Sequence, residues 1–270
     1  MPTQAEKGRV FRALHERGGA FLIPNPWDAG TARLLEQMGF EALATTSAGH
    51  AFSDGKQDNT VDRSETMKHI SAIVEATGLP VSADLENGFG DSPETVAETI
   101  RVAAATGVAG GSIEDMSRDG HAIYEFGHAV ERIRAAAEMA RSLPFPFTLT
   151  ARAENYLAER LDLADTIRRL QAYGEAGADV LYAPGLRNLE EIAAVVRAVN
   201  RPVNVLIGPR DAGLAEFSAI GVRRVSVGSA LSRAALGAFL RAAREMRERG
   251  TFTFAEEAAS YQDINALFAG

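Results

Sequence analysis

The sequence of 270 residues predicts one (β/α)₈ barrel domain that spans residues 1–270. Eight short apolar runs alternate with longer segments whose apolar residues recur at helical spacing. Several of these helical segments end in glycine just ahead of the next run, where a left-handed helix cap is expected. The units are even and none resembles the edge strand of a sheet. Closure into a barrel is therefore favoured over an open doubly wound sheet.

The expected strands follow one another along the whole chain. In order, they are residues 20–25, 41–47, 80–86, 109–115, 147–154, 179–185, 202–208 and 223–229. Helical segments such as 92–107 connect them, and Ser92 with Pro93 marks a helix start, because serine caps a helix and proline fits its first turn. Residues 9–18 predict an extra helix before the first strand. Residues 251–270 predict a further amphipathic helix after the eighth unit.

The composition argues against several classes of function. The formal net charge is −8, with no block rich in lysine or arginine, which argues against a nucleic-acid partner. The chain has no cysteine, so disulfides, zinc–thiolate sites and thiol nucleophiles are excluded. The first residues lack an apolar signal core, and no apolar run is long enough to span a bilayer. We therefore expect a cytoplasmic enzyme or binding protein without a membrane partner.

Polar side chains gather at the carboxyl ends of the expected strands. In a (β/α)₈ barrel this end carries the active site. The residues in question are Asn25, Ser47, Asp84, Glu86, Glu114, Asp115, Arg152, Glu154, Tyr182 and Asn204.

Acidic residues on neighbouring strands predict a metal site. Asp84 and Glu86 are two apart, so in a regular strand both face the same side, where their charges repel unless a cation or a proton lies between them. Glu114 ends the next strand, whereas the adjacent Asp115 should face the opposite way. Such a set suits a hard divalent cation, Mg²⁺ foremost and Mn²⁺ as a substitute, held partly through water. The alternative is that these acids cap helices or pair with arginines.

Other residues at the same end are candidates for binding a substrate. Arg152 is expected on the opposite side of the barrel, where its guanidinium could hold a carboxylate or phosphonate; the alternative is an internal salt bridge to Glu154 or Glu114. The small residues 45–49 offer backbone N–H groups to an anion, and His50 beside them is a candidate proton carrier.

Trp27 and Asn204 are included among the substrate contacts, although packing is the plainer interpretation of Trp27. Asp28 is expected to cap a helix. Four further histidines are expected at the surface or in capping positions: His15, His69, His121 and His128.

Taken together, several motifs resemble the isocitrate lyase/phosphoenolpyruvate mutase superfamily. They are "NPWDAGTARLLEQMGFEALATTSAG", "SADLENGFGDSPETVAETI", "GVAGGSIED", "TARAEN", "AGADVLYAPG" and "VRRVSVGSAL", and they extend over nearly the whole chain. The resemblance implies a Mg²⁺-dependent barrel that makes or breaks C–C or P–C bonds beside a 2-oxo or 2-hydroxy carboxylate, with an enolate on the metal. It also implies a last helix, within 251–270, that is exchanged between subunits of a homotetramer built as a dimer of dimers.

The resemblance also assigns roles to individual residues. Asp84 matches the direct metal ligand, and Glu86 and Glu114 match carboxylates that hold metal-bound water. Asp58 matches a loop acid near the metal, and Arg152 the substrate-binding arginine. The matched cradle for the substrate carboxylate is Ser47, Ala48 and Gly49.

The chain also departs from the family pattern. Family lyases carry a gating loop with a catalytic cysteine, and the mutase and its hydrolase relatives carry a lysine there, whereas residues 114–133 contain neither. Glu86 stands where the family has an aspartate. We expect a lyase or decarboxylase acting on a small oxo- or hydroxy-dicarboxylate, similar to oxaloacetate decarboxylase, with His50, His121 or water as the general acid. The alternatives are phosphonopyruvate chemistry and a non-catalytic carboxylate-binding barrel.

Overall fold

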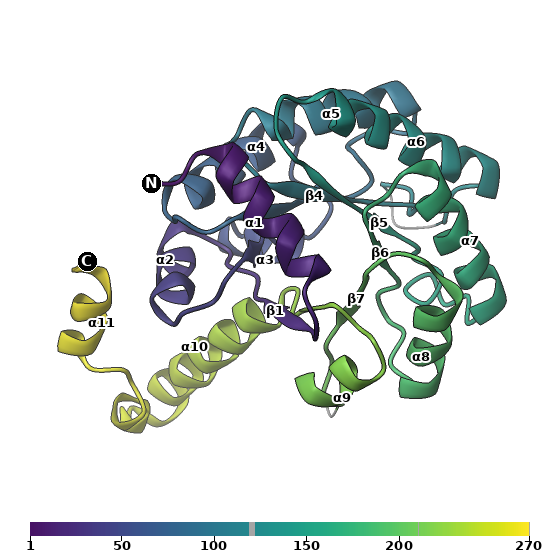
Figure 1. The fold of residues 1–270 in the computed structure, drawn as a ribbon. Helices are drawn as coiled ribbons and strands as arrows, with labels where there is room; N and C mark the ends of the chain where they lie inside the picture. The colour runs from purple at the N-terminus through teal and green to yellow at the C-terminus, as the bar shows by residue number, and fades with distance from the viewer. Residues whose placement is uncertain (119–121, 210, 270) are drawn as a thin grey trace.

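The computed structural model describes residues 1–118, 122–209 and 211–269 and confirms the (β/α)₈ barrel (Figure 1). Its eight strands are all parallel and follow the sheet order β1-β8-β7-β6-β5-β4-β3-β2. They are β1 (Phe21–Ile23), β2 (Leu43–Ala44), β3 (Val81–Asp84), β4 (Gly110–Glu114), β5 (Thr148–Arg152), β6 (Val180–Tyr182), β7 (Val203–Leu206) and β8 (Arg224–Ser226).

The helices surround the barrel as the sequence periodicity predicts. They are α1 (Gln4–Glu16), α2 (Ala29–Gln37), α3 (Ser47–Ser53), α4 (Arg63–Glu75), α5 (Pro93–Ala104), α6 (Phe126–Ser142), α7 (Leu163–Ala176), α8 (Leu189–Ala198), α9 (Leu214–Ala219) and α10 (Ala230–Arg249), followed by the short η1 (Thr253–Glu256) and α11 (Tyr261–Phe268). Ser92 caps α5 ahead of Pro93, and Asp28 caps α2 through the N–H of Thr31, as expected. No helix in the described ranges is both long and apolar enough to cross a membrane.

Asn25 joins the two ends of the sheet where β1 meets β2. Its amide Nδ2 donates to the carbonyl of Thr45 at 2.9 Å, and its Oδ1 accepts the N–H groups of Val227 and Gly228 at 3.0 and 2.9 Å. The N–H of Ala44 adds a bond of 3.0 Å to the carbonyl of Pro24, so the seam is held at the active-site end. This side chain serves closure of the barrel as well as lining its mouth.

The N-terminal helix α1 covers the opposite end of the barrel. Phe11 of α1 is fully buried, and the ring of His15 lies edge-on between Phe11 and Phe21, at centroid distances of 4.8 and 5.0 Å. The expectation of a surface or capping role for His15 is therefore wrong, because α1 lies against the strands rather than beside them. Burial lowers the pKa of His15 to about 3, with nearby Arg224 adding to the effect, so the imidazole is neutral.

The C-terminal arm, which consists of α10, η1 and α11, makes few contacts with its own barrel. Figure 1 shows α10 leading away from the barrel, with α11 at its far end. All 20 residues of α10 are described, and only Ser232 among them is buried. Phe239 is 67% exposed and Tyr261 84% exposed. At the tip of the arm, Arg33 of α2 donates to the carbonyl of Phe268 at 3.1 Å.

If the helix expected within 251–270 were continuous, Phe254, Ala258 and Tyr261 would share one apolar face at helical spacing, and this expectation is wrong. Residues 253–256 form the short helix η1, and the non-helical residues 257–260 separate η1 from α11, so no single apolar stripe runs through the segment. Exchange of the arm between subunits stays a prediction. Its physical basis is the apolar surface of α10 and α11, which lacks cover within the described chain and is of the kind that an oligomer interface buries.

Removing the arm should weaken an oligomer. A chain ending at Phe252 lacks η1 and α11, so we expect sedimentation velocity to show a smaller species than the tetramer expected for the full chain. A chain ending at Phe268 is the control and should keep the oligomeric state of the full-length protein. Sedimentation of the full chain as a monomer, or an unchanged mass after truncation, would contradict the prediction.

Candidate active site

A cavity of about 230 Å³ opens at the carboxyl ends of the strands. Its lining includes Ala48, Asp58, Asp84, Arg152 and Asn204, all of which the sequence proposes as binding or catalytic residues. They come from the start of α3, the loop before α4, and the strands β3, β5 and β7. The fold therefore brings together side chains that are up to 156 positions apart in the sequence, as expected for this end of a barrel.

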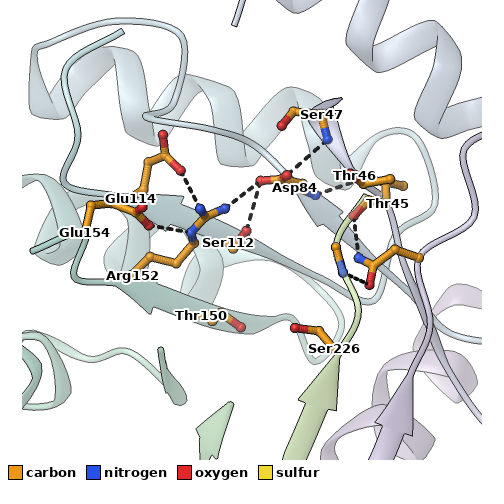
Figure 2. A network of polar contacts seen from close by, with 12 residues as sticks. Thr45, Thr46, Ser47, Asp84, Ser112, Glu114, Thr150, Arg152, Glu154 and Ser226 are labelled. Atoms are coloured by element: carbon orange, nitrogen blue, oxygen red, sulfur yellow. Dashed lines mark hydrogen bonds and ion pairs between the residues drawn. The ribbon is translucent and has the colours of Figure 1, made fainter. Parts of the chain in front are cut away.

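Asp84 is fixed by contacts from two neighbouring elements (Figure 2). Its Oδ2 accepts the backbone N–H of Ser47 at 3.1 Å, and its own N–H donates to Thr45 Oγ1 at 2.8 Å. Its Oδ1 lies 3.5 Å from the hydroxyl of Ser112. Because the backbone of both β3 and α3 takes part, the carboxylate is held at the mouth of the cavity and cannot turn away into solvent.

Arg152 ends β5 and is surrounded by carboxylates. Its Nη1 lies 3.1 Å from Asp84 Oδ1, its Nη2 lies 3.0 Å from Glu114 Oε2, and its Nε lies 2.8 Å from Glu154 Oε1. Figure 2 shows the guanidinium at the centre of these contacts. The sequence-based placement opposite the acids is wrong, because Arg152 and Glu114 are direct partners in the β4–β5 ladder. The internal salt bridges given as the alternative are present.

Glu86 departs most from its expected geometry. Strand β3 ends at Asp84, and Glu86 lies in the following turn with φ +50°, so the argument that both side chains share one strand face is wrong. Glu86 is 4% exposed, and among the described residues its Oε2 has no hydrogen-bond partner; Arg118 Nη1 is 3.8 Å away. Burial, reinforced by Asp84, raises the pKa of Glu86 to about 7.

The pKa values of two other acids in the cluster, Glu114 and Asp58, are also raised. Burial raises the pKa of Glu114 well above its ordinary value, and the nearby Arg152 offsets only part of this. Burial, followed by the charge of Asp84, raises the pKa of Asp58, which comes from the loop after α3. Asp58 lines the cavity together with Asp84, and its role beside a metal stays a prediction.

The acidic side chains at the cavity have the donor chemistry of a divalent-cation site. Asp58, Asp84, Glu86 and Glu114 gather at one place, with Arg152 as their main counter-charge, and one buried oxygen of Glu86 has no hydrogen-bond partner among the described residues. No three acidic or histidine side chains in the described parts of the chain converge as direct ligands. The donor set therefore fits a hard cation that one carboxylate contacts directly and the others reach through water.

The expected carboxylate cradle is the first turn of α3. The N–H of Ser47 is bonded to Asp84, and the N–H of Gly49 donates to Thr46 Oγ1 at 3.2 Å, so Ala48 is the member that lines the cavity. Gly49 is required for packing, because a Cβ there would lie 2.5 Å from Thr46 Cγ2 and 3.0 Å from the Cβ of Trp27. Within the described part of the chain, Trp27 is not among the residues that line the cavity, which favours a packing role for it.

His50 is directed away from the cavity. Its ring stacks on His69 at 3.7 Å between centroids, and its Nε2 lies 3.3 Å from Asp54 Oδ2. Burial lowers the pKa of His50, so the ring is neutral near pH 7. In this conformation it cannot hand a proton to a molecule in the cavity. The other histidine proposed as general acid, His121, lies outside the described residues.

Asp115 has the structural role that strand alternation predicts. It faces away from the barrel interior, accepts from the N–H of Glu154 at 2.8 Å and pairs with Arg169 at 3.0 Å. The hydroxyl of Tyr173 donates to the same carboxylate at 2.5 Å. This buried network ties β4 and β5 to α7 behind the site.

Sequence reasoning missed the polar side chains deeper in the barrel. Ser82, Ser112, Ser226 and Arg224 all line the cavity, and Asn204 donates to Ser226 Oγ at 3.0 Å. A signal for them exists in the sequence. Polar residues alternate along strands that should be apolar in a filled barrel, and the inward ones are two positions apart.

Comparison with known proteins places these features in a wider group. Residues 11–247 match the family model described as phosphoenolpyruvate phosphomutase. The 2-methylisocitrate lyase of Escherichia coli is 33% identical, and the match covers 73% of this chain and 68% of that enzyme.

Solved structures agree with the sequence matches. A Burkholderia cenocepacia protein provisionally described as a lyase or mutase is 64% identical, with a TM-score of 0.95 over 99% of this chain and 97% of that one. Oxaloacetate acetylhydrolase with its product oxalate is 25% identical, with a TM-score of 0.89 over 99% and 95% of the two chains. Phosphonopyruvate hydrolase with oxalate and Mg²⁺ is 25% identical, with a TM-score of 0.85 over 97% and 94%.

Proposed function

Because the chain belongs to the isocitrate lyase/phosphoenolpyruvate mutase superfamily, whose members are named as lyases and mutases, we propose that it is a Mg²⁺-dependent carbon–carbon lyase or decarboxylase. The proposed substrate is a small 2-oxo or 2-hydroxy dicarboxylate, with an oxaloacetate decarboxylase-like reaction as the first choice. The observation that carries the proposal is the crowded carboxylate cluster around Asp84 with Arg152 at the same cavity.

The metal would be held at Asp84, with Glu86 and Glu114 reaching it through water. The buried oxygen of Glu86 that lacks a hydrogen-bond partner and the crowding of acidic side chains around Asp84 support this assignment, because a cation would satisfy the first and relieve the second. Mn²⁺ prefers the same oxygen donors. When bound, the cation supplies Lewis-acid stabilisation of negative charge that develops on the substrate.

The chain's own residues bind and orient the substrate. Arg152 presents a planar guanidinium that can turn from its carboxylate partners to a substrate carboxylate, beside Ala48 at the start of α3. Asp58 is the preferred proton carrier over His50, because Asp58 lines the cavity whereas His50 is stacked on His69. Residues 114–133 contain no lysine or cysteine, and decarboxylation makes the least demand on that loop.

A second candidate is hydrolysis or rearrangement of a phosphonopyruvate. It is favoured by the likeness to phosphonopyruvate hydrolase and by the family model, and the same cluster and arginine would bind either class of substrate. A non-catalytic barrel that binds carboxylates is the third.

One panel separates these functions. Oxaloacetate, phosphonopyruvate, methylisocitrate and substituted malates are incubated with the protein in Mg²⁺, in Mn²⁺ and in EDTA, and products are followed by NMR. We expect cleavage of a dicarboxylate in Mg²⁺ and Mn²⁺ and none in EDTA. Turnover of phosphonopyruvate alone would favour the second candidate. Tight binding of a panel member without turnover would favour the third.

A further inference from the structure

We infer that Arg224 forms a second anion site on the floor of the cavity, which takes the far carboxylate of a dicarboxylate substrate. The identity of the substrate rests on the proposed function, whereas the site itself rests on the surroundings of Arg224. This residue begins β8, where its neighbours in register are Phe21 of β1 and Asn204 of β7. It is 5% exposed, yet it lines the cavity.

The guanidinium of Arg224 contacts only neutral groups. Its Nε donates to Asn204 Oδ1 at 2.8 Å, its Nη2 donates to Thr150 Oγ1 at 2.9 Å, and its Nη1 lies 3.4 Å from His15 Nε2. Within residues 1–118, 122–209 and 211–269, no carboxylate forms an ion pair with it. Burial lowers the pKa of Arg224 to about 10, and the nearby Tyr182 offsets only part of the effect.

Other buried arginines of the described chain either pair with carboxylates or lie away from the cavity. Arg132 is of the second kind: it is 1% exposed, donates to the backbone carbonyls of Asn87, Gly90 and Asp91, and is not among the residues that line the cavity. Arg152 contacts three carboxylates, and Arg169 contacts Asp115 at 3.0 Å and Asp165 at 2.9 Å. A cation in a desolvated interior is costly unless a negative charge accompanies it. The hydrogen bonds of Arg224 hold its position, but they leave its charge uncompensated until an anion enters the cavity.

The charge of Arg224 is directed toward the cavity. Behind it, the neutral ring of His15 lies between Phe11 and Phe21 and separates it from the far end of the barrel. Toward the mouth, Thr150 and Ser226 face one another below Asp84 in Figure 2. An anion that enters from the mouth can therefore reach the guanidinium, whereas the opposite end is closed by α1.

The cavity thus carries opposite charges at its two ends. The mouth holds the acidic cluster that suits a cation, and the floor holds Arg224. Asp84 lies 3.5 Å from Ser112, which pairs in register with Thr150, the residue that Arg224 contacts. Neighbouring strands are about 4.8 Å apart, so a short carbon chain can connect the two ends. The ligand class is a dicarboxylate whose second carboxylate is separated from the metal-binding end by at least one carbon.

The test compares a short and a longer ligand by calorimetry in Mg²⁺. Oxalate has no carbon between its carboxylates and should bind at the mouth alone, whereas 3,3-difluorooxaloacetate extends to the floor. In Arg224→Met, we expect the dissociation constant of difluorooxaloacetate to rise roughly 30-fold or more and that of oxalate by less than about threefold. Arg224→Lys should give an intermediate loss for difluorooxaloacetate alone. The control is Arg223→Met, because Arg223 is adjacent in sequence but is not among the described residues that line the cavity. We expect no change in the dissociation constant of either ligand.

Several results would overturn the inference. They are an equal loss of both ligands in Arg224→Met, an unchanged affinity for difluorooxaloacetate, or a wild-type protein that binds oxalate but not difluorooxaloacetate. If Arg224→Met does not fold, Arg224→Lys decides by the same comparison of the two ligands. The test measures binding and not turnover. A protein that turns over none of the substrate panel would therefore contradict the proposed function, but the comparison of oxalate with difluorooxaloacetate binding would still decide the inference about Arg224.

Discussion

Replacing Asp84 by alanine should abolish Mg²⁺-dependent turnover while the barrel still folds. Asp84 lines the cavity and is held there by the backbone N–H of Ser47 and the hydroxyl of Ser112. Loss of a residue that only supports a metal ligand commonly costs about 10–100-fold in affinity or activity, so loss of the ligand itself should exceed about 100-fold. Titration calorimetry with Mg²⁺ and the rate on the best substrate of the panel measure the two effects.

A matched control separates the metal from the fold. Asp28→Ala removes the N-cap of α2 at a residue that is not among those lining the cavity, and should cost about 1 kcal/mol of unfolding free energy without a change in kcat. Asp84→Ala should show the reverse, with native circular dichroism and no metal-dependent rate. Undiminished Mg²⁺ affinity in Asp84→Ala would show that the cation binds elsewhere.

Replacing Arg152 should lower kcat/KM for the substrate but leave the affinity for Mg²⁺ unchanged or tighter. Loss of a charge-assisted contact in a desolvated pocket costs about 2–5 kcal/mol, so kcat/KM should fall roughly 30-fold or more in Arg152→Ala. Arg152→Lys should recover only part of this loss, because an ammonium lacks the planar fork. Asp84 and Glu114 lose a competing cation in Arg152→Ala, so the affinity for Mg²⁺ should be unchanged or tighter.

The stability of Arg152→Ala gives a further readout. Breaking a buried ion pair by removing one partner costs about 3–5 kcal/mol, and Glu114 and Glu154 are both left without their counter-charge. Bound Mg²⁺ should restore part of the lost thermal stability. Arg17→Ala, which breaks an exposed pair with Glu41, is the control and should change neither rate nor stability appreciably. Wild-type kcat/KM in both Arg152 variants would mean that this arginine is only an ion-pair partner.

The fold could be predicted from the sequence because each unit carries its own local signal. The apolar run, the helical periodicity and the caps at Asp28 and Ser92 depend on residues close together in the chain. Element boundaries were less predictable. The run 80–86 was expected to be strand throughout, but β3 ends at Asp84, because the turn that follows requires left-handed backbone at Glu86 and Gly88.

The site was predictable in composition but not in its pairings. Acids and an arginine at strand ends identify the mouth of a barrel, whereas the contact between Arg152 and Glu114 depends on the register of β4 against β5. The same limit applies to Arg224, because a pair of adjacent arginines does not reveal which one faces inward. The burial of His15 depends on where α1 crosses the barrel, a long-range packing choice with no local sequence signal.

The left-handed backbone of Glu86 has a consequence for how this chain would evolve under selection for heat resistance. A non-glycine residue at φ +50° costs on the order of 1 kcal/mol, and a buried carboxylate with a partnerless oxygen adds to that cost. Glycine at this position would relieve both penalties. A library screened for thermal tolerance alone would therefore drift toward losing the acid, whereas one screened for turnover would retain it. The residue at position 86 is thus a compromise between thermal stability and catalytic turnover.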